Sequence, residues 1–208
     1  MNKIITISRE FGSGGREFGR LLAENLNIAY YDQEIIREIS KRTKLAEQYV
    51  EQIVEKKPIM PFPIHVGCRL HSYSFPSPIL EQHLSIMMEQ SKIIRDMAEK
   101  SDCVIVGRCG DDILEQFRPY RIFIYAELEH RVKRCLNRCT EDEAFSPSEM
   151  EKKILSVDKN RKKYYEFYTG KSWGNPLNYD LCINTTNVEP SELMSLIHWR
   201  MLSSLAER

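Results

Sequence analysis

The sequence has no hydrophobic run that approaches the roughly 20 residues needed for a membrane-spanning helix. Its first residues, MNKIITIS, contain too short an apolar stretch for a secretory signal and no small-residue cleavage site. These absences argue against a membrane protein and against export. We therefore expect a protein without a membrane partner that works in the cytoplasm.

The cysteines and histidines lack the arrangements that bind metals or form nucleophiles. The chain has 6 cysteines, but none forms a Cys-x-x-Cys pair or the Cys/His spacing of a zinc site. Cys135 and Cys139 lie four residues apart, which allows chelation on a helix, but no second pair accompanies them. No Ser/His/Asp or Cys/His nucleophile arrangement appears. We predict no metal site made by protein ligands alone, and reduced thiols.

Net charge is absent as well, because 30 Lys and Arg residues balance 30 Asp and Glu residues in a chain of 208. A neutral chain is not a globally basic nucleic-acid binder, so we expect no nucleic-acid polymer among its partners. Hydrophobic residues make up 42% and aromatic residues 10% of the chain, which argues against disorder. The length fits a single domain over residues 1–208 and does not indicate an oligomeric state.

Short apolar runs alternate with stretches of helical periodicity, which is typical of an α/β fold with a parallel sheet. The predicted strands are residues 3–8, 28–31, 103–106, 121–125 and 181–184. The predicted helices are residues 16–25, 33 onward, 79–101, 128–138, 147–168 and 190–207. Prolines at 58, 61, 63, 76 and 78 exclude regular structure between them and predict a loop.

The strongest functional signal is a glycine cluster between the first predicted strand and the first predicted helix, where the chain reads ISREFGSGGREFG. A glycine turn at a helix N-terminus allows consecutive backbone N–H groups to surround an anion. We predict an anion-binding loop; the alternative is a turn that only reverses the chain.

Two named glycine patterns fail at this loop. The Rossmann pattern requires glycine where the chain has Glu17. The strict P-loop pattern requires Gly, Lys and Ser or Thr where the chain has Arg9, Gly15 and Arg16.

Five segments stand in order along the chain: ISREFGSGGREFG, YYDQEII, VGRCGDDIL, RIFIYAELEHRVKR and VDKNRKKYYEFYTGKSWGNPLNYDLCIN. This set, over about residues 3–185, resembles the cytidylate kinase-like proteins of bacteria, relatives of cytidylate kinase among the P-loop nucleoside-monophosphate kinases. The resemblance implies a P-loop kinase fold with a five-stranded parallel sheet flanked by helices. It also implies an acceptor-binding insertion over about residues 33–100 and a lid over about residues 131–163.

The reaction implied by the resemblance is transfer of the γ-phosphoryl group of ATP to a nucleoside monophosphate such as CMP, with Mg²⁺ as cofactor. Cytidylate kinases have Gly-Ser-Gly-Lys-Gly-Thr at the positions of Gly12, Ser13, Gly14, Gly15, Arg16 and Glu17. By resemblance these residues bind the ATP phosphates, although the lysine falls on Gly15. Arg16 is the candidate to restore the positive charge; alternatively, it faces solvent on the first helical turn. Glu17 either favours magnesium or complements the helix N-terminus.

Three residues are candidates for the acceptor site. By resemblance Asp32 binds the acceptor's sugar, and capping of the following helix is an equal expectation. Arg37, one turn on, is a candidate for the acceptor phosphate, with a solvated helix face as the alternative. Arg108 follows an apolar strand, where open α/β sheets bind ligands, and it matches the arginine of the Gly-Arg-Asp motif of cytidylate kinases. The aspartate of that motif, which reads cytosine, is Cys109 here.

Charge is segregated between residues 131 and 163, in a basic, an acidic and a second basic block. The pattern fits a solvated helical hairpin or a lid that closes over phosphates. The resemblance favours the lid, in which Arg131, Arg134 and Arg138 contact ATP phosphates. Asp158 and Arg161 match the Asp-x-x-Arg of the cytidylate-kinase lid, where the arginine meets phosphates and the aspartate orients the site.

We therefore predict a kinase with Arg16, Asp158 and Arg161 as catalytic residues, and with ATP and a small phosphorylated acceptor as partners. Two alternatives remain open. One is a nucleotide-binding regulatory protein that lost catalysis together with the loop lysine. The other is a kinase of a non-nucleotide small molecule, because Cys109 replaces the residue that reads cytosine.

Overall fold

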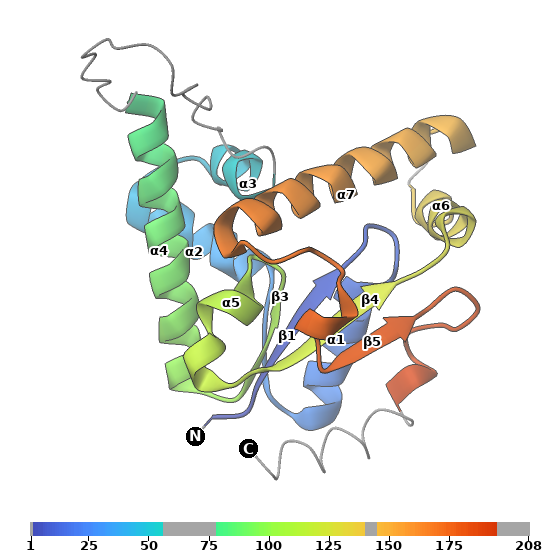
Figure 1. Ribbon diagram of the computed structural model, residues 1–208, viewed down its shortest axis with the longest axis horizontal. Helices are drawn as coiled ribbons and strands as arrows, with labels where there is room; N and C mark the ends of the chain where they lie inside the picture. Colours follow the sequence, from blue (N-terminus) through green and yellow to red (C-terminus); the bar gives the residue numbers. More distant parts are fainter. Residues whose placement is uncertain (1, 56–77, 140–144, 195–208) are drawn as a thin grey trace.

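The computed structural model describes residues 2–55, 78–139 and 145–194. These residues contain a five-stranded parallel sheet covered by helices (Figure 1). Its strands are β1 (Ile4–Arg9), β2 (Ala29–Tyr31), β3 (Cys103–Val106), β4 (Tyr120–Tyr125) and β5 (Leu181–Asn184), in the spatial order β2-β3-β1-β4-β5. The predicted fold class is confirmed, because each predicted strand is present within one residue of its expected bounds.

Helices follow the strands along the chain. They are α1 (Gly15–Leu26), α2 (Gln33–Thr43), α3 (Glu47–Glu55), α4 (Pro78–Lys100), α5 (Gly110–Ile113), α6 (Leu128–Leu136) and α7 (Pro147–Thr169), with 3-10 turns η1 (Glu115–Phe117) and η2 (Pro176–Asn178). The sequence did not separate α2 from α3, which Lys44 divides by adopting a left-handed φ of 57°. Nor did it predict the short α5.

Some predicted features fall on parts of the chain outside the described ranges. The proline-rich loop lies outside them up to residue 77, and so does part of the acidic block, at residues 140–144. The helix predicted at 190–207 is described only as far as residue 194.

The sheet separates two hydrophobic cores, because successive side chains of a strand point to opposite faces. Cys103 and Ile105 of β3 belong to the core formed with α2, α3 and α4. Val104 and Val106 belong to the core formed with α1. All four side chains are fully buried. This two-sided burial explains why the central strands read as continuous apolar runs.

Helix α7 crosses the end of the sheet at which the strands terminate (Figure 1). It begins with a reciprocal capping box in which the Ser146 hydroxyl accepts the Glu149 N–H and the Glu149 carboxylate accepts the Ser146 N–H. Open α/β sheets bind ligands at this end, so the fold brings α7 to the edge where a site is expected. No helix in the described part of the chain has the length and hydropathy needed to cross a bilayer.

We expect Leu22→Ala to lower the free energy of unfolding by about 2–5 kcal/mol, because a buried side chain is removed and a cavity remains. Leu22 lies on α1 and is 1% exposed. Leu177→Ala is the matched control, since Leu177 is 89% exposed, and it should change stability by less than about 0.5 kcal/mol. Urea unfolding measures both; equal losses would contradict the packing of α1 on the sheet.

Candidate active site

The loop between β1 and α1 has the conformation of a tight glycine turn. Gly12 and Gly14 have φ angles of +78° and +80°, in the left-handed region that favours glycine. Gly14 is the N-cap of α1, and its carbonyl accepts the N–H of Phe18 at 2.9 Å. A Cβ at Gly12 would lie 2.8 Å from Sγ of Cys135, so α6 packs directly against the loop. We call residues 10–15 the phosphate loop from here on.

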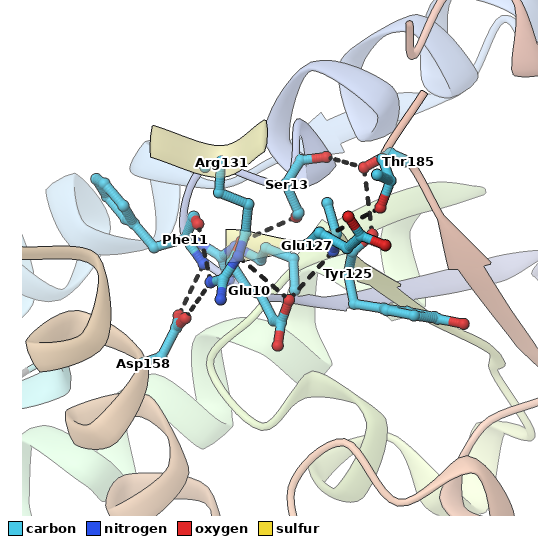
Figure 2. Close-up of polar contacts among 12 residues, drawn as sticks. Glu10, Phe11, Ser13, Tyr125, Glu127, Arg131, Asp158 and Thr185 are labelled. Carbon is cyan, nitrogen blue, oxygen red and sulfur yellow. Dashed lines mark hydrogen bonds and ion pairs between the residues drawn. The ribbon is translucent and has the colours of Figure 1, made fainter. Parts of the chain in front are cut away.

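A buried ion pair holds the backbone of Phe11, as Figure 2 shows. Nη1 of Arg131 lies 2.5 Å from Oδ2 of Asp158 and donates to the Phe11 carbonyl at 3.3 Å. Oδ1 of Asp158 accepts the Phe11 N–H at 2.7 Å. Arg131 is 6% exposed and Asp158 is 9% exposed. Charge-assisted hydrogen bonds therefore fix both ends of one loop residue.

Other contacts in Figure 2 hold the loop from the side of β4 and β5. The hydroxyl of Thr185, the residue after β5, donates to the Ser13 carbonyl at 2.7 Å. The Ser13 hydroxyl donates to the Glu10 carbonyl at 2.8 Å. Oε2 of Glu10 accepts the Ala126 N–H at 3.1 Å and lies 3.5 Å from Nε of Arg131. Burial raises the pKa of the Glu10 carboxyl, and the charge of Arg131 opposes that rise.

Two more arginines, Arg134 of α6 and Arg138 in the turn that follows it, point toward the loop and α1. Arg134 donates to the Gly12 carbonyl at 3.1 Å and to the Thr185 carbonyl at 3.0 Å. Arg138 forms an exposed ion pair with Glu17 in the first turn of α1. In this arrangement Arg134 binds loop backbone, as Arg131 does, whereas Arg138 borders the open space beside the loop.

Asp32 lies at the N-cap position of α2, but its side chain makes no capping hydrogen bond. The capping expectation is therefore not met by this side chain. Its Oδ2 lies 2.5 Å from Nε of Arg16, and its Oδ1 lies 3.8 Å from Nη2 of Arg9. The Arg16 side chain is 57% exposed, whereas Asp32 is only 2% exposed. The carboxylate thus links the end of β1 to the first turn of α1.

A small pocket lies at the ends of β1 and β3, and we call it the Arg108 pocket. Its walls include Cys109, Tyr164, Tyr165 and Trp173. Arg108 is 6% exposed and has a left-handed φ of 60°. Burial raises the pKa of the Cys109 thiol well above its usual value, so this residue presents a neutral group.

Buried hydrogen bonds fix the walls of the Arg108 pocket. Nε2 of Gln90 donates to the Arg108 carbonyl at 3.2 Å and to the Tyr164 hydroxyl at 3.1 Å. The Tyr165 hydroxyl donates to Oδ2 of Asp111 at 2.6 Å. Burial and the neighbouring Asp111 raise the pKa of Tyr165, which keeps its phenol protonated and able to donate.

A larger cavity follows the phosphate loop, and we call it the loop cleft. Arg9 and Arg161 line both the loop cleft and the Arg108 pocket, so the two cavities meet at these side chains. Arg161 reaches down from α7, donates to the Arg9 carbonyl at 3.3 Å and stands 5.6 Å from the centre of the Phe11 ring. The same two arginines therefore border both cavities.

Most of the site residues predicted from the sequence fall into two groups: some line the loop cleft, and others hold the loop by hydrogen bonds. Those that line the loop cleft are Gly12, Gly14, Gly15, Arg16, Arg138 and Arg161. Ser13, Arg131, Arg134 and Asp158 make the contacts that hold the loop.

Arg37 lies apart from both cavities, 56% exposed and 3.7 Å from Glu34. Sequence reasoning missed Arg9, Glu10 and Thr185. Of these three, only Arg9 could have been noticed from the sequence, because it stands where the P-loop pattern has its first glycine.

In the part of the chain that the structure describes, no three His, Cys, Asp or Glu side chains are grouped to hold a metal ion. Two acidic residues, Glu10 and Glu51, do line the loop cleft. Magnesium bound together with a nucleotide needs only one or two carboxylates, because phosphates and waters supply its other oxygens. The cleft therefore fits a magnesium ion that arrives with phosphates.

Comparison with known proteins shows the family and supports the fold. The model of the cytidylate kinase-like family matches residues 4–187. An uncharacterized protein from Eubacterium ventriosum ATCC 27560 has a crystal structure with 27% identity and a TM-score of 0.68, covering 99% of each chain. No curated protein sequence matches the chain.

Two shikimate kinase structures share the fold at low identity. That from Bacteroides thetaiotaomicron has 11% identity and a TM-score of 0.57, covering 97% of this chain and 99% of its own. That from Acinetobacter baumannii, in complex with shikimate, has 16% identity and a TM-score of 0.51, covering 98% of this chain and 94% of its own.

We expect Thr185→Val to destabilise the protein by about 1–3 kcal/mol, because it removes the donor to the buried Ser13 carbonyl. Thr43→Val is the matched control: its hydroxyl donates at 2.8 Å to the carbonyl of Ile39 within α2, so less should be lost. Urea unfolding compares the two variants. A Thr185 variant as stable as the wild type would show that this contact does not hold the loop.

Proposed function

The chain belongs to the cytidylate kinase-like family, and we propose that it transfers the γ-phosphoryl group of ATP to a small phosphorylated acceptor such as a nucleoside monophosphate. In this reaction an oxygen of the acceptor phosphate bonds to the γ-phosphorus while the bond from that phosphorus to ADP breaks. The observation that carries the proposal is the meeting of the loop cleft and the Arg108 pocket at Arg9 and Arg161. Phosphoryl transfer depends on aligning two ligands and neutralising charge between them.

The donor side of the proposal is the loop cleft. Backbone N–H groups of residues 12–17 stand at the N-terminus of α1, where the helix dipole favours phosphate. Arg16 and Arg138 line the same cleft and add positive charge. Arg131, Arg134 and Asp158 act here as positioning residues, because they bind the backbone of the loop. Such fixed donors stabilise developing charge without having to reorganise during the reaction.

The acceptor side is the Arg108 pocket, with Arg108 as the ligand of the acceptor phosphate or base. Tyr165 and Trp173 supply flat aromatic walls against which a ring can stack. The position that reads cytosine in cytidylate kinases is the neutral thiol of Cys109, which cannot accept hydrogen bonds as a carboxylate does. Asp32 and Arg37, to which the resemblance assigns the acceptor's sugar and phosphate, line neither the Arg108 pocket nor the loop cleft.

Magnesium fits the proposal as a companion of ATP. Glu10 and Glu51 are the residues that would hold it, directly or through water, from the wall of the loop cleft. When bound, the ion would neutralise charge on the phosphate oxygens. The backbone N–H groups of the loop and the arginine side chains would orient the phosphates and displace water from them.

A kinase of a non-nucleotide small molecule is the second candidate, because Cys109 removes the group expected to read a cytosine base. We expect ATP consumption to rise when the protein is mixed with MgATP and its acceptor. The screen compares CMP, dCMP, UMP and AMP with a panel of small metabolites that includes shikimate. ATP binding without consumption on any acceptor would instead support a regulatory protein. Absence of both binding and consumption would contradict the proposed function.

Arg108 and Arg161 should have separable effects on the reaction. We expect Arg108→Ala to raise the KM for the acceptor by about 10-fold or more with little change for ATP, because a charged contact to the acceptor is lost. Arg161→Ala should lower kcat by about 100-fold or more, because its charge faces both ligands.

Arg121→Ala is the control for both variants, since Arg121 pairs with Asp180 at 3.2 Å and lines neither cavity. Steady-state kinetics with each substrate varied separates the two effects. Equal losses in all three variants would point to general destabilisation.

A further inference from the structure

The space beside Gly15 is occupied by the stem of Arg9. A Cβ at position 15 would lie 2.6 Å from Cβ and 3.0 Å from Cγ of Arg9. These atoms belong to the base of a side chain anchored in β1, so they cannot swing away as the tip of a flexible chain can. A lysine at position 15 is therefore incompatible with Arg9 as it stands.

The guanidinium of Arg9 lies at the centre of the proposed site. Arg9 is the last residue of β1 and is 8% exposed. Its Nη2 lies 3.8 Å from Oδ1 of Asp32, and a Cβ at Gly107 would lie only 1.9 Å from its Nη1. The head group thus fills the gap between the start of α2 and the end of β3. There it borders both the loop cleft and the Arg108 pocket.

We infer that Arg9 is the phosphate-binding cation of this chain and takes over the role of the missing loop lysine. This inference rests on the proposed function and names the residue that contacts the phosphoryl group between ATP and the acceptor. A guanidinium presents a planar set of N–H donors that matches phosphate oxygens, so it can replace an ammonium as a phosphate ligand.

Arg16 is the arginine that the sequence offered as a replacement for the loop lysine, and its surroundings differ from those of Arg9. It borders the loop cleft but not the Arg108 pocket, and its side chain is 57% exposed. A charge open to water is screened, whereas a buried charge such as Arg9 interacts more strongly with a bound phosphate. Arg16 therefore adds to the field around ATP, while Arg9 stands where the two ligands meet.

Two of the three departures from the P-loop pattern, those at positions 9 and 15, are then a single exchange. The pattern has glycine at position 9 and lysine at position 15, whereas this chain has arginine and glycine there. The cation has moved from the helix side of the loop to the end of the strand. Glycine at position 9 alone would remove the cation. Lysine at position 15 alone would clash with the stem of Arg9, which fills the volume next to Gly15.

A cycle of three variants tests the exchange: Arg9→Gly, Gly15→Lys and the double variant. Readouts are the urea unfolding midpoint and the dissociation constants of MgATP and adenosine. We expect Gly15→Lys to lower the midpoint, because the new side chain collides with Arg9. Arg9→Gly should weaken MgATP binding by about 10- to 100-fold, the value of one lost charged contact, with adenosine little affected. The double variant should recover most of both losses.

Arg9→Gln provides a second test in case Arg9→Gly does not fold, because glutamine keeps most of the stem and removes the charge. It should weaken MgATP more than Arg9→Lys does, whereas a purely structural role would affect MgATP and adenosine alike. Arg121→Ala is the control arginine variant, with unchanged binding expected.

The outcomes separate this inference from the proposed function. If the wild type binds MgATP and Arg9→Gln binds it equally well, Arg9 is not the phosphate ligand, and the proposed function stands. A double variant with the same urea midpoint as Gly15→Lys and the same MgATP dissociation constant as Arg9→Gly would contradict the exchange of the cation between positions 15 and 9. If the wild type binds no nucleotide and transfers no phosphate, the proposed function fails, and the inference fails with it.

Discussion

The buried pair of Arg131 and Asp158 is the interaction on which the phosphate loop depends. Removing two charges from water costs several kcal/mol per ion, so such a pair persists only where further hydrogen bonds offset that cost. Here the extra bonds go to the carbonyl and the N–H of Phe11. The pair is therefore satisfied only when the loop is in place, and the loop is fixed only when α6 and α7 are packed together.

The same arrangement fixes successive carbonyls of the loop. The carbonyls of Phe11, Gly12 and Ser13 accept hydrogen bonds from Arg131, Arg134 and Thr185 respectively. A planar trans peptide directs its N–H away from its C=O, so holding the carbonyls of Phe11 and Ser13 also fixes the directions of the Gly12 and Gly14 N–H groups. The N–H of Ser13 donates to the Glu10 carbonyl at 3.4 Å and closes the turn. Side chains from distant elements thus take over part of what a regular glycine-rich loop achieves by its own backbone geometry. The loop is therefore held in a defined conformation without following the strict P-loop pattern.

The sequence was informative where a local pattern carries the structure. Strands such as Cys103–Val106 were predicted because burial on both faces leaves an unbroken apolar run. The loop was predicted because glycines must stand where φ is positive. The contacts that hold the loop join residues 147 and 172 positions apart, as in Phe11 with Asp158 and Ser13 with Thr185, and no local pattern encodes them. The role of Arg9 was missed for a related reason. An arginine at the end of an apolar strand is typical of a solvated strand terminus, whereas the packing beside Gly15 shows that Arg9 is buried within the site.

Placing the cation on the strand rather than on the helix changes how the charge is held. A lysine in the first turn of a helix reaches the phosphates on a flexible stem, whereas Arg9 is fixed by the sheet, by Asp32 and by the close approach of Gly107. The carboxylate of Asp32 offsets the cost of burying the guanidinium, so the charge is retained in a site largely closed to water. A fixed charge of this kind needs little reorganisation when phosphate arrives. The neutral net charge of the chain is thus compatible with a strongly basic site, because its acids and bases are paired locally and the arginines converge where the two cavities meet.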